Sequence, residues 1–252
     1  MIGCDVIIEF VMPHDRSIEF DVHEIKLGDV IFQITCEENI LSLKGKIESE
    51  SREEAYDKAK DIANVFRLSM LYRSNIGLTI NDIKIPSCIQ IDEEGRHIKL
   101  DIMEGIKLYE EVSSKLTSGE KLVKDLEELF SRFIRKYNLL NEKEKDKLNR
   151  IIRWYIKGLL ASDNVDKFIY YYIVLDAIAG IYYPNLGVTS RVRKMLEAYN
   201  LKYKYGDKPI TEIRGALFHN IEMEELAARI SNEFGSAVLK ILKEHINKIF
   251  FN

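Results

Sequence analysis

The first part of the chain alternates between hydrophobic and polar positions in short runs, which is the pattern of half-buried β-strands. The runs are rich in β-branched residues and are bounded by Gly, Asp, Asn or Pro. They cover residues 6–11, 17–22, 30–36, 40–47, 77–83, 87–91 and 97–103. This alternation predicts an antiparallel sheet.

One segment within this region has the period of a helix instead. Ser51 and Glu54 match the pattern of a capping box, in which the serine hydroxyl accepts a hydrogen bond from the backbone three residues later. Apolar positions then recur three or four residues apart to about Tyr72: Ala55, Ala59, Ile62, Ala63, Phe66 and Met70. Residues 1–104 are therefore predicted to form an α+β domain with one helix packed on the sheet.

From residue 105 onward the hydrophobic period is helical, and no convincing strand pattern is present. Asn141 and Glu144 form a second capping-box pattern ahead of an apolar stripe. Helices are expected at residues 106–116, 122–134, 141–159, 168–181, 190–199, 210–219 and 221–250. Residues 105–252 are thus predicted to be an all-α helical bundle.

Composition indicates a globular protein, because 46% of the residues are hydrophobic and 31% are charged. The N-terminus lacks the basic and apolar regions of a signal peptide. The longest apolar stretch, residues 168–183, is interrupted by Asp176 and is too short for a bilayer span. We expect a cytoplasmic protein without a membrane partner. Glutamine is scarce beside abundant Lys, Glu and Ile, a bias expected of proteins from hot environments.

Sequence motifs for metal or cofactor chemistry are missing. Cys4, Cys36 and Cys88 show no CxxC spacing, so we expect buried reduced thiols rather than a zinc site or a disulfide framework. A P-loop, a GxGxxG turn, HExxH and GxSxG are also absent. No metal and no cofactor is therefore predicted.

The candidate chemistry lies near the C-terminus, where Arg214 and His219 stand five positions apart. An arginine can hold a phosphate oxygen, and a histidine can move a proton near neutral pH. Thirteen arginines and five histidines produce one fixed spacing by chance in roughly a quarter of such chains, so the pair needs context. Arg16 and His23 fit a looser version of the pattern but lie among predicted strands.

A basic stretch precedes this pair in a chain whose net charge is −4. Residues 191–208 contain six cations against Glu197 and Asp207: Arg191, Arg193, Lys194, Lys202, Lys204 and Lys208. Arg191, Arg193 and Lys194, together with Asn220, are candidates for contacting a nucleic-acid substrate. The alternative is a merely solvated loop.

The whole pattern resembles HEPN domains, and most closely their ApeA-like group. The resemblance covers roughly residues 106–252 and rests on three features: an apolar helix containing Asp176, the basic stretch, and the segment 210–220 followed by a final helix. It implies a homodimer in which Arg and His from two subunits meet and cleave RNA without metal. Arg214 would stabilise the phosphate, and His219 would be the general acid or base.

Each residue also has a structural reading. Arg214 could be an ordinary ion-paired arginine, and His219 could favour a helix dipole. Asp176 needs a partner if it is buried, and Arg214, His219 or a tyrosine hydroxyl could supply one. A carboxylate of this kind would orient and charge the catalytic pair.

Gly215 departs from the family pattern, which often has a polar residue directly after the arginine. The glycine favours a rival hypothesis, a non-catalytic dimeric module that binds a nucleotide, RNA or a protein. It could also mark the close approach of a partner helix. In a third hypothesis the protein is a structural adaptor and the Arg214 and His219 pair is incidental.

Overall fold

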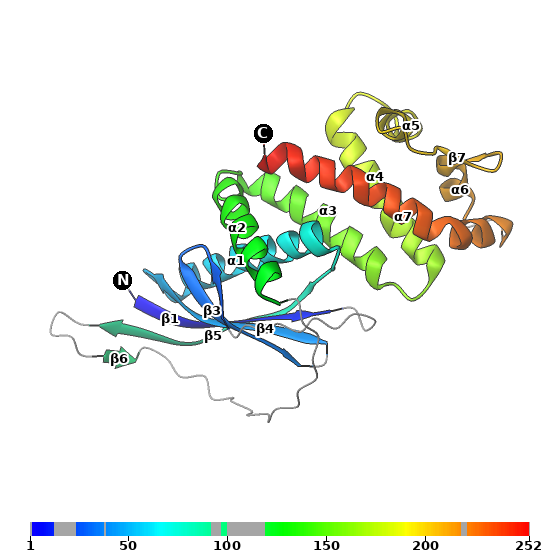
Figure 1. Cartoon of the computed structure of the whole chain (residues 1–252). Helices are drawn as coiled ribbons and strands as arrows, with labels where there is room; N and C mark the ends of the chain where they lie inside the picture. The colour runs from blue at the N-terminus through cyan, green and yellow to red at the C-terminus, as the bar shows by residue number, and fades with distance from the viewer. Residues whose placement is uncertain are drawn as a thin grey trace. The chain divides into compact units, whose positions relative to one another are not determined.

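The computed structural model describes residues 2–12, 24–37, 39–91, 97–99, 119–217 and 221–251. They form two compact units, one ending at Leu139 and the other beginning at Leu140 (Figure 1). The predicted order, an α+β part followed by a helical part, is confirmed. The division lies later along the chain than the predicted boundary at residue 104.

The first unit contains an antiparallel sheet with the strand order β2-β3-β4-β1-β5-β6. The strands are β1 (Ile2–Val11), β2 (Glu24–Leu27), β3 (Val30–Glu37), β4 (Ile40–Ser49), β5 (Thr79–Ile91) and β6 (His97–Lys99). Alternate residues of β1 are buried, so the period-two pattern places one face of this central strand in the core. The ring of Phe10 on that face lies 5.4 Å from the ring of Phe66 in the helix that covers it.

The predicted strands at residues 77–83 and 87–91 are one continuous strand, β5. Between Asp5 and Ile7 the register of β1 with β5 shifts by one residue, which places a bulge beside Pro86. Proline has no N–H to donate to the ladder, and bulges are where a sheet tolerates it. The predicted strand at 17–22 lies outside the described residues, and the short β2 was missed.

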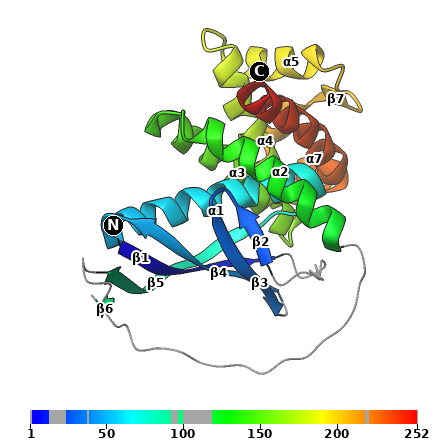
Figure 2. The ribbon, with the colours of Figure 1, turned by 60° about the vertical axis from the view of Figure 1, so that its left-hand side comes forward.

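Two helices pack beside this sheet. Helix α1 (Arg52–Ser74) begins as predicted, with the Ser51 hydroxyl accepting from the backbone N–H of Glu54 at 3.1 Å. Helix α2 (Gly119–Tyr137) contacts α1, and the rings of Tyr72 and Phe133 meet edge to face at 5.6 Å. Figure 2 shows both helices along one side of the sheet. The apolar stripe of α2 is buried in this unit, which explains the later boundary.

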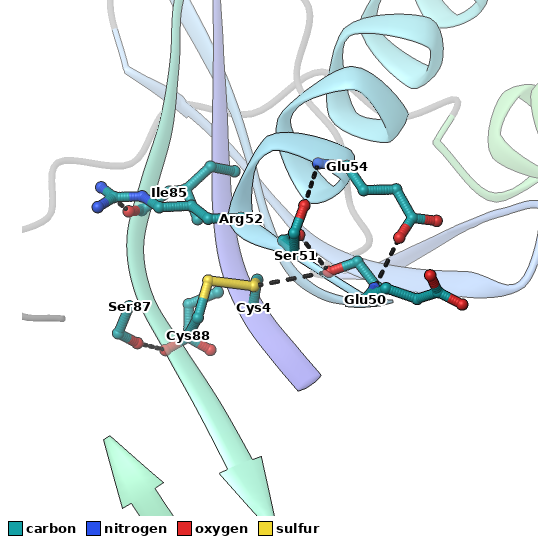
Figure 3. The surroundings of a disulfide bond; sticks show 10 residues. Cys4, Glu50, Ser51, Arg52, Glu54, Ile85, Ser87 and Cys88 are labelled. Carbon is teal, nitrogen blue, oxygen red and sulfur yellow. Dashed lines mark hydrogen bonds between the residues drawn. A yellow bond between two sulfur atoms is a disulfide. The ribbon is translucent and has the colours of Figure 1, made fainter. Parts of the chain in front are cut away.

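Cys4 of β1 and Cys88 of β5 form a disulfide, so the expectation of reduced thiols is wrong for these two residues (Figure 3). They are direct partners in the ladder although 84 positions apart. Both side chains are buried, with 0% and 3% of their surface exposed. The prediction used spacing along the sequence, whereas strand register brought these two positions together. Cys36 is not part of this disulfide.

The second unit is helical, as predicted. Its helices are α3 (Glu142–Leu160), α4 (Asn164–Tyr182), α5 (Val188–Ala198), α6 (Ile210–Ala216) and α7 (Ile221–Phe250). The Asn141 capping box is present, with its side chain accepting from Glu144 at 3.0 Å. A small hairpin, β7 (Lys204–Tyr205) with β8 (Lys208–Pro209), was missed because its strands are only two residues long.

Helix α4 is the centre of this unit and contacts both α3 and α7. The Tyr171 ring of α4 lies between Gly158 of α3 and Gly235 of α7. A Cβ atom at either glycine would approach that ring within 2.5 Å, so both positions exclude a side chain. This tight packing fixes α4, from which the candidate site projects.

Among the helices that the structure describes, none is both long enough and apolar enough to cross a bilayer.

Candidate functional site

Arg214 projects from the short helix α6, which is anchored by two fully buried side chains, Ile210 and Ile213. The Arg214 side chain is exposed, and its Cζ lies 5.8 Å from the centre of the Tyr172 ring on α4. This distance permits a cation–π interaction, which holds a guanidinium without neutralising it. Within the described part of the chain Arg214 forms no ion pair.

A small pocket opens beside this arginine. It is lined by the apolar side chains Ile169, Ile173 and Leu217, by Tyr172 and by Arg214, and its volume is about 70 Å³. This volume exceeds the roughly 10–15 Å³ that a single water molecule needs, so the pocket accommodates a small group. Arg214 is the one charged residue among the described residues that line the pocket. Because its guanidinium is positive, the pocket favours a ligand with an anionic group.

Asp176 pairs with Arg191 rather than with any of the partners expected from the sequence. Its two carboxylate oxygens accept from Nε and Nη2 of Arg191 at 2.7 and 2.8 Å, a bidentate geometry that joins α4 to α5. The hydrogen bonds that Arg191 donates to Asp176 raise the pKa of the Arg191 guanidinium. Two donors of Arg191, a predicted substrate-binding residue, are therefore committed to Asp176.

Tyr172 lies one helical turn before Asp176, and its ring is the one beside Arg214. Burial raises the pKa of its phenol to about 12, with a further increase from the charge of Asp176 and an opposing effect from Arg214. Tyr172 therefore stays protonated at neutral pH. Tyr172 was not among the candidate residues of the sequence, and its spacing of four positions from Asp176 was the signal that was available.

The basic stretch of residues 191–208 is largely neutralised by its surroundings. Four of its six cations pair with carboxylates: Arg191 with Asp176, Arg193 with Glu197, Lys202 with Glu233 and Lys208 with Glu212. Lys194 lies with its Nζ 5.0 Å from the centre of the Tyr183 ring. The local positive potential is thus smaller than the sequence count indicates, which favours the solvated-surface reading.

His219 and Asn220 lie outside the described residues, as do Arg16 and His23. Helix α6 ends at Ala216, so the predicted helix at 210–219 is shorter than expected, and α7 begins at Ile221. Gly215 is exposed, and a Cβ added there would have no atom within 4 Å. Packing among the described residues therefore does not require a glycine at this position.

No family model, curated protein or solved structure matches the chain.

The described residues bring together Arg214, Tyr172, Asp176 and Arg191, and they leave Arg193 and Lys194 in contacts of their own on α5. No group of three or more potential metal-binding side chains is found among them. Arg214 lines a small apolar pocket and forms no ion pair with a described residue, so its guanidinium can bind a phosphate oxygen. The ion pair of Asp176 with Arg191 lies one helical turn from the ring that Arg214 contacts.

Proposed function

We propose that the helical unit is a HEPN-like module that cleaves RNA without a metal ion. The observation that carries the proposal is the state of Arg214: it is exposed, lies over Tyr172 where it lines the pocket, and is free of any ion pair among the described residues. A cation that must contact phosphate cannot already be neutralised by a carboxylate. Most cations of the preceding basic stretch fail that condition.

In this reaction the ribose 2′-oxygen attacks the adjacent phosphorus, and the bond from phosphorus to the 5′-oxygen breaks. His219 takes the proton from the 2′-hydroxyl, and the His219 of a second copy gives a proton to the leaving 5′-oxygen. The products are a 2′,3′-cyclic phosphate and a 5′-hydroxyl. Arg214 stabilises the charge that develops on the phosphate oxygens.

Asp176 acts in this scheme as a positioning residue. Its bidentate pair with Arg191 fixes α5 against α4, beside the ring that supports Arg214. Loss of the pair should therefore raise KM and reduce kcat through misplacement of Arg214, without changing the pH profile set by His219. An unchanged KM and kcat in Asp176→Asn would contradict this role.

The same face of α4 supports the homodimer. Ile169, Ile173, Ala177 and Ile181 recur at every fourth position and are partly or fully exposed, Ile181 to 41%. Such a stripe is the apolar face that a second helix covers. Ile169 and Ile173 also line the Arg214 pocket, so a second copy seated there would bring two Arg214 side chains to one groove.

The dimer is tested by sedimentation with Ile173→Glu, which should shift the protein to the monomer. Leu160→Glu, at an exposed leucine of α3, is the matched control and should leave the dimer intact. A wild-type protein that sediments as a monomer at all concentrations would sink this part of the proposal.

Cleavage is tested with a defined RNA in the presence of EDTA, with analysis of the product ends for cyclic phosphate. Arg214→Ala and His219→Ala should each lose at least about a hundredfold in rate, the magnitude typical of one catalytic group. Arg193→Ala, an exposed arginine paired with Glu197, is the control and should cleave normally. Undiminished cleavage by Arg214→Ala would remove the site assignment.

The non-catalytic binding module remains the second candidate, and Gly215 favours it. No described neighbour demands this glycine, and it places no polar side chain beside Arg214. If the second candidate is correct, no RNA is cleaved under any condition, but saturable RNA binding is measured that Arg214→Ala weakens.

A further inference from the structure

Helix α3 carries a cationic surface that the reaction above does not use. From Lys147 to Leu160 the sequence contains no Asp or Glu. The exposed cations of this part are Lys147, Arg150, Arg153 and Lys157, which we call the α3 cationic face. None of the four forms an ion pair with a described residue.

The beginning of the same helix provides an internal comparison. There Glu142, Glu144 and Asp146 alternate with lysines, and Lys145 pairs with Glu142 at 3.4 Å. This mixture of signs is what a merely solvated helix face shows. The change to a single sign after Asp146 is therefore specific to one part of α3.

Aromatic rings lie within the cationic face. The rings of Trp154 on α3 and Tyr170 on α4 stack, with their centres 5.6 Å apart and their planes inclined by 29°. Both side chains are only partly buried. The Nζ of Lys157 lies 4.7 Å from the centre of the Trp154 ring. An accessible stacked pair flanked by cations is the arrangement on which unpaired bases stack in single-strand binding proteins.

We propose that the α3 cationic face, with Trp154 and Tyr170, binds single-stranded nucleic acid. A base stacks on the accessible side of the aromatic pair, and the phosphates on either side contact Lys147, Arg150, Arg153 and Lys157. The rise of a helix places Lys147 and Lys157 about 15 Å apart, long enough for several consecutive phosphates. A duplex keeps its bases stacked and cannot offer one to the rings.

Two carboxylates precede Tyr170 in the sequence, and neither of these described residues forms an ion pair with the α3 cationic face. Asp163 accepts from the backbone N–H groups of Val165 and Asp166 at the start of α4. Asp166 stands one turn before Tyr170 and is followed directly by Lys167. The proposal does not depend on RNA cleavage, because it concerns binding at residues that the reaction does not use.

The test uses oligothymidine, which has no 2′-hydroxyl and therefore survives even if the protein cleaves RNA. Trp154 is the sole tryptophan of the chain, so intrinsic tryptophan fluorescence reports on the proposed surface alone. Titration should quench it saturably, and a DNA duplex of the same length should bind at least about tenfold more weakly. Binding without any change in Trp154 fluorescence would overturn the proposal.

The contribution of the cations is tested with the triple variant Arg150→Gln, Arg153→Gln and Lys157→Gln. It should raise the Kd by about tenfold or more, and should reduce the slope of log K against log salt by about 2, since each single-strand phosphate contact contributes about 0.7. The side chains are exposed, so the fold should persist, which circular dichroism verifies.

The matched control removes three paired cations by Arg193→Gln, Lys202→Gln and Lys208→Gln. It changes the net charge equally and should alter the Kd by no more than about twofold. An equal loss in both triple variants would mean that only net charge matters and would overturn the proposal. Equal quenching by polyglutamate would do the same, because it would identify an acidic polypeptide as the ligand.

Discussion

The basic stretch at residues 191–208 and the α3 cationic face have the same sign of charge but differ in what surrounds it. In the first, four of six cations contact a carboxylate. In the second, none of the four does so within the described residues. The comparison teaches that counting charges along a sequence locates cations, whereas only the fold shows which of them can still hold a phosphate.

Both groups of cations lie in the helical unit, so their properties should not depend on the disulfide of the sheet unit. Removing that disulfide is the change with the largest expected effect on stability. A cross-link that closes a loop of 84 positions stabilises by about 4.5 kcal/mol in the chain-entropy description. Cys4→Ala with Cys88→Ala should destabilise the sheet unit by that amount. Oligothymidine binding and Trp154 fluorescence should be unchanged. Denaturant unfolding followed by both signals measures this, and a parallel loss of binding would contradict it.

The stability of the helical unit should depend on pH through His245. This residue is buried in α7, and its Nδ1 lies 3.0 Å from the Tyr182 hydroxyl. Burial, with a smaller contribution from Lys248, lowers the pKa of His245 to about 4 from 6.5. As the pH falls from about 6.5 to about 4, the His245 imidazole is therefore protonated in the unfolded chain but not in the folded chain. The helical unit should lose about 3 kcal/mol over this range.

Denaturant unfolding at several pH values checks this expectation. His245→Gln should make the stability of the unit nearly independent of pH over the same interval. Tyr182→Phe keeps the titrating ring and should preserve the acid sensitivity. An acid sensitivity that survives in His245→Gln would assign the effect to other groups.

A smaller loss of stability is expected when the ion pair of Asp176 with Arg191 is broken. The substitution of Asp176 leaves Arg191 without its carboxylate partner. Asp176→Ala should cost about 1 to 2 kcal/mol, because the pair is bidentate and only 23% to 25% exposed. Adding Arg191→Ala should recover part of that loss, and thermal unfolding of the four proteins of this cycle measures it. Strictly additive losses would show that the two side chains do not interact.

The smallest effects are expected at the exposed pairs of the basic stretch. Lys208→Gln and Arg193→Gln each break an exposed ion pair between residues four positions apart. Each should change stability by less than about 0.5 kcal/mol, because water and salt screen such pairs. Thermal unfolding measures this, and a loss several times larger would reveal a structural role for the stretch.

Hydrophobic period predicted most of the elements, because it reports directly which face of an element is buried. The helices α3, α4 and α7 lie close to their expected ranges, and the cap at Asn141 formed from local chemistry alone. Strand register and helix partners depend on distant residues. The sequence therefore could not reveal the pairing of Cys4 with Cys88, or that α2 packs on α1.

The candidate site was predicted in part. A carboxylate within an apolar helix needed a cation, and Asp176 has one, but several were within reach and only the packing of α5 selected Arg191. The cation–π contact of Arg214 with Tyr172 and the stacking of Trp154 on Tyr170 join residues from different helices. The hydrophobic pattern of a single helix does not predict contacts with residues of another helix.

One measurement tests the distinction between committed and uncommitted cations most directly: labelling of arginines by a dicarbonyl reagent, read by mass spectrometry with and without oligothymidine. Arg150, Arg153 and Arg214 should react faster than Arg191, whose Nε and Nη2 are held by Asp176. Oligothymidine should protect Arg150 and Arg153 and leave Arg193 unchanged. Protection of Arg191 and Arg193, with Arg150 and Arg153 unaffected, would contradict the account.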